Sequence, residues 1–453
     1  MLSRLICGFA MTCLLWAASV RAQAPESTAP PQQEAPKRYA NMPDEAVPYR
    51  NFSKPYKEWF MDPNTLEYNG AARDRVDEEM LKSPTVNIGF LGPIENNPES
   101  PYGIAMLRGD QLAIEEANAR GGYRGAAGAA AKPYALMIHN DAALWGASSA
   151  EAVKMVFDEH VISTVGSIDG ASTHIMLRVS LKLEFPIMDT GTTDPTVTET
   201  RIPWVMHDFP DDRQQGYTLA DYIFKQRKLK RIGVIRTQTR YARMGVAKFF
   251  DEAKRMGHVP VFETKFDRGD TDFAAQVRML KGAKLDAVVI WGEGKEAGLI
   301  LKQMRAAGMK QPVFGSSRTG YSEMLAIAGD AAEGFVCTSP LDFSRTDGRW
   351  VSFVERYRAK YNTDPDAYAA YAYDGMNILI GAVEKAGLNR GKVMDAFREY
   401  ANKTYDGVAG TERFDATLNN IAPLGLARVE GGRFVYWSPR ADAAVAVKSG
   451  GQL

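Results

Sequence analysis

Two stretches of the chain combine hydroxyl side chains with glycine directly after short apolar segments. The first, "SIDGASTH" (167–174), follows "VISTVG", and the second, "DTGTTDPTVTET" (189–200), follows "FPIM". Serine and threonine hydroxyls, together with backbone N–H groups, are neutral hydrogen-bonding groups that suit a carboxylate, carbonyl or hydroxyl group of a small molecule. The same composition is also common in solvated loops, so both interpretations stay open at this level.

Motifs for catalysis are missing from the sequence. It has no G-x-S-x-G, H-E-x-x-H or G-x-x-x-x-G-K-[ST] segment. "GEGKEAG" (292–298) follows an apolar stretch, but its glycine spacing is one residue too long for a dinucleotide-binding loop. The 5 histidines show no metal-ligand spacing, and Cys337 is the only cysteine after residue 24. We therefore predict no catalytic residue, no cofactor and no metal site.

The composition is that of a soluble protein with a large hydrophobic core. Of 453 residues, 45% are hydrophobic and 24% are charged, and the length is sufficient for more than one domain. Basic and acidic residues balance at 55 each, so no overall field attracts nucleic acid or anionic membranes. We expect no nucleic-acid partner.

Residues 1–24 have the pattern of a secretory signal peptide. Arg4 precedes the apolar segment "LICGFAMTCLLWAASV", and the small residues Ala22 and Ala24 predict cleavage after Ala24. An uncleaved membrane anchor is the alternative, although the apolar segment is short for a membrane span. The sequence therefore predicts export.

Residues 25–85 differ from the rest of the chain because they are rich in proline and aromatic residues. Prolines are scattered from Pro25 to Pro84, so we expect no regular structure in this extension. The aromatic residues between Tyr49 and Tyr68 predict a strap that packs on its own domain, with docking on a partner protein as the alternative. Residues 438–453 are expected to form a tail.

From Val86 onward, strand-like apolar segments alternate with amphipathic segments that end at glycine. One run contains "VNIGFL", "YALMIH", "VISTVG" and "FPIM", and a second contains "RIGVIR", "VPVFETKF", "LDAVVIW" and "QPVFG". This alternation predicts an α/β fold with two doubly wound lobes, each a parallel sheet covered by helices on both faces. Ligands of such sheets bind outside the carboxyl ends of the strands, so 167–174 and 189–200 are predicted to face one crevice.

From about Val86 to Trp437 the chain resembles the type I periplasmic solute-binding proteins of ABC importers, in the branch of the branched-chain amino acid (leucine/isoleucine/valine) receptors. The matching segments are "RGDQLAIEEANARGG", "FPIMDTGTTDPTVT", "DDRQQGYTLADYI", "TDFAAQVRMLKGAKLDAVVIWG", "ILKQMRAAGMKQPVFG", "AGDAAEGFVCTSP" and "YAAYAYDGMNILIGAVEKAG". The resemblance implies two parallel-sheet lobes, joined by three crossover strands, that close on a ligand.

The resemblance also implies boundaries and a function. The crossover strands are expected near residues 205–212, 335–341 and 408–414. The first lobe would comprise 86–207 plus 340–409, and the second lobe 208–337 plus 410–437. The implied protein is a monomeric periplasmic receptor that delivers a small polar solute to an ABC permease in the inner membrane. A receptor that feeds a membrane signalling protein and a periplasmic enzyme on the same lobes are the alternatives.

Ligand-contact positions carry over from the family residue by residue. Tyr102 and Tyr241 fall where an aromatic side chain from each lobe covers the ligand. The loop that holds an amino acid carboxylate falls on Gly170, Ala171 and Ser172, flanked by Asp169 and Thr173. A second pair of contacts, one carbonyl and one hydroxyl, falls on Gly191 and Thr193.

Two departures from the family put an amino acid ligand in question. Ser317 stands where the family has the glutamate that pairs with the α-ammonium group, so Asp169 or Glu293 would have to replace that carboxylate. Arg318 lies beside it, and the longer first loop adds Glu95 and Glu99. If Arg318 points inward rather than to water, it adds a charged fork for a carboxylate. Together with the neutral donors of 169–173 and 189–193, it favours a small carboxylate or a neutral amide- or urea-like solute over an amino acid with a free ammonium group.

Overall fold

The computed structural model describes residues 71–125 and 131–437. The predicted signal peptide (1–24), residues 25–70 of the extension and the tail (438–453) lie outside the described residues. Among the residues described, no helix combines the length and the apolar character that a membrane span requires.

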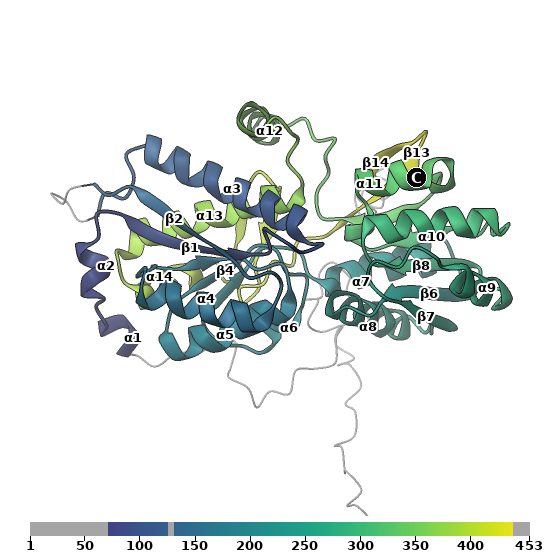
Figure 1. The fold of residues 1–453 in the computed structure, drawn as a ribbon, viewed down its shortest axis with the longest axis horizontal. Helices are drawn as coiled ribbons and strands as arrows, with labels where there is room; N and C mark the ends of the chain where they lie inside the picture. Colours follow the sequence, from purple (N-terminus) through teal and green to yellow (C-terminus); the bar gives the residue numbers. More distant parts are fainter. Residues whose placement is uncertain (1–70, 126–130, 438–453) are drawn as a thin grey trace, which may run out of the picture.

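Two sheets with parallel central strands, each flanked by helices, form two lobes that lie side by side (Figure 1). The first sheet has 5 strands in the order β2-β1-β3-β4-β5, and all of its pairs are parallel. Its strands are β1 (Val86–Gly92), β2 (Tyr134–Asn140), β3 (Thr164–Val165), β4 (Ile187–Asp189) and β5 (Val205–His207). We call this sheet and its helices the first lobe.

The second sheet has 7 strands in the order β14-β13-β10-β9-β8-β6-β7. Its strands are β6 (Ile232–Thr237), β7 (Phe262–Phe266), β8 (Ala287–Trp291), β9 (Val313–Gly315), β10 (Val336–Ser339), β13 (Gly425–Glu430) and β14 (Arg433–Trp437). This sheet and its helices are the second lobe. The predicted α/β fold with two doubly wound lobes is confirmed.

Along the central strands of the second lobe, apolar side chains point alternately to the two faces of the sheet, which explains why both faces are covered. Val234 and Val289 pack into one hydrophobic core, whereas their neighbours Ile235 and Ile290 pack into the core on the opposite face. Successive side chains of a strand point to opposite faces, so an apolar run must bury both. The helical segments that cover these cores are α7 (Asp212–Ala220), η5 (Asp221–Gln226), α8 (Arg240–Arg255), α9 (Ala274–Gly282), α10 (Gly294–Ala306), η6 (Ser317–Thr319), α11 (Ser322–Ala328) and η7 (Gly329–Ala332).

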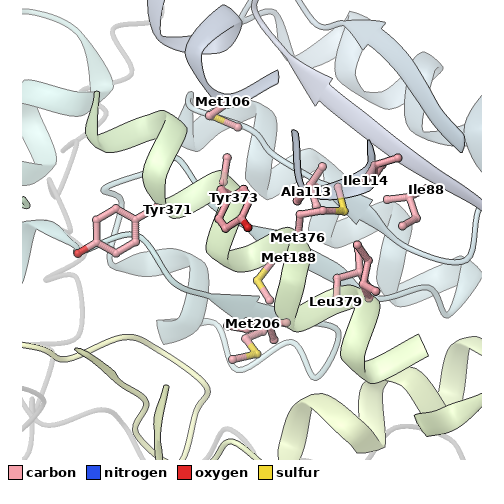
Figure 2. Close-up of a cluster of buried hydrophobic side chains, with 14 of the residues drawn as sticks. Ile88, Met106, Ala113, Ile114, Met188, Met206, Tyr371, Tyr373, Met376 and Leu379 are labelled. Carbon is pink, nitrogen blue, oxygen red and sulfur yellow. The ribbon is translucent and has the colours of Figure 1, made fainter. Parts of the chain in front are cut away.

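The first lobe is covered by helices from both halves of the chain. One face of its sheet carries α4 (Trp145–Phe157), α5 (Gly170–Leu183) and α6 (Thr196–Glu199), and the other carries α3 (Ser100–Ala119), α12 (Gly348–Tyr361), α13 (Ala367–Ala386) and α14 (Arg390–Arg398). Figure 2 shows Met106, Met188, Met206 and Met376 filling the core around α13. Flexible thioether side chains suit this irregular space.

Helices α3 and α13 pack closely because Gly109 has no side chain. A Cβ atom at Gly109 would lie 2.2 Å from the carbonyl oxygen of Ala369. This close approach holds α3, and the loop that precedes it in the chain, against α13.

Residues 71–82 correct the expectation that the extension has no regular structure. They form two short helices, α1 (Ala71–Asp74) and α2 (Glu78–Lys82), because no proline interrupts the chain between residues 63 and 84. Met80 is buried in the core of the first lobe, and Asp77 forms an ion pair with Arg390 at 3.1 Å. This part of the chain therefore belongs to the first lobe.

The last strands of the second sheet are antiparallel, which the strand–helix alternation did not predict. β13 pairs antiparallel with both β10 and β14. Before it, β11 (Thr404–Asp406) and β12 (Thr411–Arg413) form a separate hairpin, and Phe414 and Leu418 pack in the core of the first lobe. We therefore propose that the third passage between the lobes follows Leu418, later than the expected 408–414.

Candidate ligand-binding site

The loops at the carboxyl ends of the strands meet between the lobes around one small cavity. The first lobe contributes Glu99, Ile168, Asp169, Gly170, Thr192, Thr193 and Asp194, and the second lobe contributes Arg240, Tyr241 and Arg318. The cavity volume is about 10 Å³, close to the space for one water molecule. The two lobes are therefore closed on each other, with side chains filling the cleft.

Arg318 points into the middle of this cleft. It lies on η6, the short turn directly after β9, and its side chain is almost completely buried. Its guanidinium carbon is 4.2 Å from the ring centre of Tyr241 and 5.6 Å from that of Tyr102. A cation between two aromatic faces is stabilised by the electron-rich faces of the rings. Arg318 thus lies between the rings of Tyr102 and Tyr241, which were predicted to cover the ligand.

Hydrogen bonds to both lobes hold the Arg318 guanidinium. Nε donates to the hydroxyl of Tyr368 at 3.0 Å, and Nη1 donates to Oε1 of Glu99 at 2.8 Å and to Oε1 of Glu293 at 3.3 Å. Nη2 reaches the carbonyl oxygen of Ile168 at 3.5 Å. Because Glu99, Tyr368 and Ile168 belong to the first lobe, Arg318 connects the lobes.

Glu99 lies at the start of α3 and accepts from two arginines of the second lobe. Its Oε1 atom also receives a hydrogen bond from Nη2 of Arg268 at 2.8 Å. Burial opposes ionisation of Glu99, but the charges of Arg318 and Arg268 outweigh it and lower the pKa of this carboxyl. Glu99 is therefore a buried carboxylate that pairs across the cleft.

Glu293 supplies a second carboxylate from the second lobe. It precedes α10 as its N-cap residue, and its Oε2 atom accepts from the hydroxyl of Tyr102 at 3.2 Å. Burial raises the pKa of Glu293, and the nearby Glu99 charge adds to the rise although Arg318 opposes it. Glu293 is the first of these acids to accept a proton as the pH falls.

Asp194 and Arg240 form another ion pair across the cleft. Nε of Arg240 donates to Oδ2 of Asp194 at 2.7 Å. A Cβ atom on Gly170 would lie 2.6 Å from the same oxygen, so only glycine leaves room for the carboxylate there. Despite burial, hydrogen bonds from His174 and Thr196 and the charge of Arg240 hold the pKa of Asp194 well below its ordinary value.

The predicted carboxylate loop forms the beginning of α5. Asp169 caps the helix by accepting from the backbone N–H of Ser172 at 2.8 Å, and Thr173 donates to the carbonyl oxygen of Asp169 at 3.0 Å. The Ser172 hydroxyl is buried and has no hydrogen-bond partner among the described residues. Gly170 lines the cavity, whereas Ala171 does not.

The second predicted loop is buried, and Thr193 connects it to α7 of the second lobe. Thr193 lines the cavity and donates to Asp212 at 3.2 Å, whereas Gly191 is packed beneath it, where a Cβ atom would lie 2.6 Å from the sulfur of Met106. Ser317 directs its backbone N–H to the side chain of Gln215 at 2.9 Å and does not line the cavity.

Several residues of this site were not among the contacts predicted one by one, although Ile168, Thr192 and Asp194 lie in the two predicted loops and Glu99 in the first loop. They are Glu99, Ile168, Thr192, Asp194, Arg240, Arg268 and Tyr368. Arg240 and Arg268 follow the carboxyl ends of β6 and β7, so the rule that ligands bind at these ends would have pointed to them. Tyr368 comes from the returning helix α13, for which that rule offers no signal.

A closed cleft that is lined by residues of two doubly wound lobes defines a two-lobed solute-binding protein. Comparison with known proteins leads to the same class. A family model described as periplasmic binding protein matches residues 85–433. A leucine-, isoleucine-, valine-, threonine- and alanine-binding protein of Pseudomonas aeruginosa is 29% identical over 333 residues, which cover 73% of this chain and 86% of that protein. The chain belongs to the periplasmic binding protein family.

Two solved structures of branched-chain amino acid receptors have the same fold. The substrate-binding protein LivJ from Streptococcus pneumoniae, in complex with isoleucine, is 26% identical with a TM-score of 0.69, covering 78% of this chain and 98% of that one. The leucine-binding protein LivK from Thermotoga maritima is 24% identical with a TM-score of 0.70, covering 79% of this chain and 100% of that one. The resemblance seen in the sequence is confirmed.

Proposed function

We propose that this protein is an exported receptor that captures a small polar organic solute between its lobes and delivers it to an ABC permease. The observation that carries the proposal is the buried contact between Arg318 of the second lobe and Glu99 of the first. Polar groups from both lobes thus converge where the solute would lie. A ligand that contacts both lobes favours the closed form and shifts the equilibrium between open and closed states.

The solute is held, in this proposal, by the aromatic rings of Tyr102 and Tyr241 and by the polar groups around them. Amino-acid-like, carboxylate and amide- or urea-like molecules all fall within this chemistry. The remaining predicted contacts are Asp169, Gly170, Ala171, Ser172, Thr173, Gly191, Thr193, Glu293, Ser317 and Arg318. Because about 10 Å³ is free in the closed cleft, the solute must displace side chains that now fill it.

We propose a receptor rather than an enzyme because the acids of the cleft are held in ion pairs. Glu99 and Asp194 each accept from arginine side chains at 2.7–2.8 Å, which keeps them ionised and unsuited to proton transfer near neutral pH.

The proposal also includes that the protein is a monomer in the periplasm and that its signal peptide is cleaved after Ala24. Intact mass and light scattering of the exported protein test these two points.

The experiment that tests the function is mass spectrometry of small molecules released by denaturing freshly purified protein. The released solute is then returned to solute-free protein, and X-ray scattering measures the radius of gyration. We expect a smaller radius with the solute than without it, and loss of uptake of that solute in cells that lack the gene. No contraction at saturating solute would contradict the receptor, and conversion of the solute would reveal an enzyme.

A further inference from the structure

The charged side chains around Arg318 are already balanced within the protein. Arg318 and Arg268 carry two positive charges, and Glu99 and Glu293 carry two negative charges. Arg318 lies 2.8 Å from Glu99 and 3.3 Å from Glu293, measured between nitrogen and carboxylate oxygen. Arg268 lies 2.8 Å from Glu99 and 3.7 Å from Glu293. The group is therefore neutral as a whole when both acids are ionised.

The other ionic pair of the cavity is balanced in the same way, because Asp194 pairs with Arg240 at 2.7 Å. Asp169, the remaining acid of the lining, is compensated by the N-terminus of α5, where it accepts from the backbone N–H of Ser172 at 2.8 Å. A solute that carries a full charge would have to break one of these buried pairs or remain uncompensated beside it. Either outcome is unfavourable, because Glu99, Asp194 and Arg318 are buried and a charge left without a partner there loses its solvation. An uncharged solute avoids this cost.

Two hydrogen-bonding atoms of the central ion pair still have capacity for a solute. Oε2 of Glu99 is buried and accepts no hydrogen bond from any described residue. Nη2 of Arg318 carries two N–H groups and, within 71–125 and 131–437, makes one long hydrogen bond, to the carbonyl oxygen of Ile168 at 3.5 Å. The two atoms belong to the side chains that are joined by the 2.8 Å hydrogen bond from Nη1 of Arg318 to Oε1 of Glu99. Both residues line the cavity.

We propose that Glu99 determines the class of ligand, which is a small uncharged solute with a primary amide or urea group. The N–H of that group donates to Oε2 of Glu99, and its carbonyl oxygen accepts from Nη2 of Arg318. Without Glu99, Arg318 and Arg268 would present an excess positive charge and the cleft would select carboxylates. This inference rests on the proposed receptor function and deepens it.

The test compares two probes of the same shape, propionamide and propionate, by calorimetry on the mature protein. The wild-type protein is compared with Glu99→Gln and with Glu95→Gln, an exposed residue of the same loop that serves as the control. We expect the wild-type protein and the control to bind propionamide at least about tenfold more tightly than propionate, and Glu99→Gln to reverse this preference. A wild-type preference for propionate, an unchanged ratio in Glu99→Gln, or no binding of either probe at about 10 mM would overturn the inference.

A second measurement needs no variant and covers the case in which Glu99→Gln fails to fold. The solute released from wild-type protein is expected to be uncharged at pH 7 and to contain an amide or urea group. A released carboxylate or amine that still contracts the protein would overturn the role given to Glu99 and leave the receptor function intact. If no solute is released, the preference of the wild-type protein between the two probes decides the inference.

Discussion

Nη1 of Arg318 lies 2.8 Å from Oε1 of Glu99, although 219 residues separate the two in the sequence. This buried pair joins the lobes at the centre of the cleft. Burying two charges costs solvation energy, which the pair recovers only when its geometry and its further hydrogen bonds are good. Closure of the lobes and the polarity of the site therefore depend on the same contact.

Replacing Arg318 by alanine should weaken binding of the released solute by about 2 kcal/mol or more, roughly 30-fold in Kd, because Glu99 and Glu293 would be left with Arg268 alone. Calorimetry measures the change. Arg278→Ala, on the exposed face of α9, is the control and should bind normally. Unchanged affinity in Arg318→Ala would mean that Arg318 does not face the solute.

Lowering the pH should shift the preference of the cleft towards carboxylates. Burial raises the pKa values of Glu293 and Asp169, so these acids accept protons first as the pH falls, while Glu99 and Asp194, whose pKa values are lowered, stay ionised. The site then gains positive charge. We expect the affinity for propionate, relative to propionamide, to rise as the pH is lowered from 8, as measured by calorimetry at pH values where propionate itself stays ionised. Glu293→Gln should reduce this trend, and the opposite trend would contradict the assignment.

Stability should fall as the pH rises, because two buried acids near the passages between the lobes have no partners among the described residues. They are Asp208, directly after β5, and Glu412 on β12. Burial, together with the charge of the nearby Asp374, raises both pKa values well above the ordinary ones. The folded protein therefore keeps protons that the unfolded chain releases near pH 4–5. The stabilisation is complete below the unfolded pKa and is lost as the pH rises through the folded pKa.

The variant Glu412→Gln tests this pH dependence, since it removes one titrating group. Between pH 5 and pH 9 its stability should fall less steeply than that of the wild-type protein, by up to about 1.4 kcal/mol per pH unit. Thermal unfolding midpoints across this range measure the difference, with Glu95→Gln as an exposed control. Equal slopes in wild-type and variant would refute the raised pKa of Glu412.

The helix α2 should contribute to the stability of the first lobe although it lies in the extension. Met80→Ala removes a buried side chain from the core and should cost about 2–5 kcal/mol in the free energy of unfolding. Leu81→Ala changes the next residue, which is 42% exposed, and should stay within about 0.5 kcal/mol of the wild-type protein. Urea unfolding measures both, and similar values for the two variants would show that α2 does not pack as described.

The fold could be predicted from the sequence because its signals are local. Apolar runs such as "AVVIW", helical spacing in α13 and glycines after helices each act within a few residues, and their order defines parallel sheets. The same logic placed the loops 167–174 and 189–200 at the carboxyl ends of strands, where Asp169, Gly170 and Thr193 line the cavity. The prediction of no regular structure in the extension was wrong for residues 71–82. It rested on the proline content of 25–85 as a whole, whereas the helices α1 and α2 contain no proline.

The electrostatics of the cleft were decided by the tertiary structure. In the sequence, Arg318 is one of many arginines that could face water, and Glu99 is one acid in a polar loop. Closing the two lobes brings these residues and Arg268 within hydrogen-bonding distance and removes Glu99 and Arg318 from solvent. The strength of a charge and the pKa of an acid depend on burial and on neighbours from distant parts of the chain. The sequence by itself thus determined the two lobes and the loops that face each other, whereas the tertiary structure decided which charges meet between them, because pairing requires contact and desolvation.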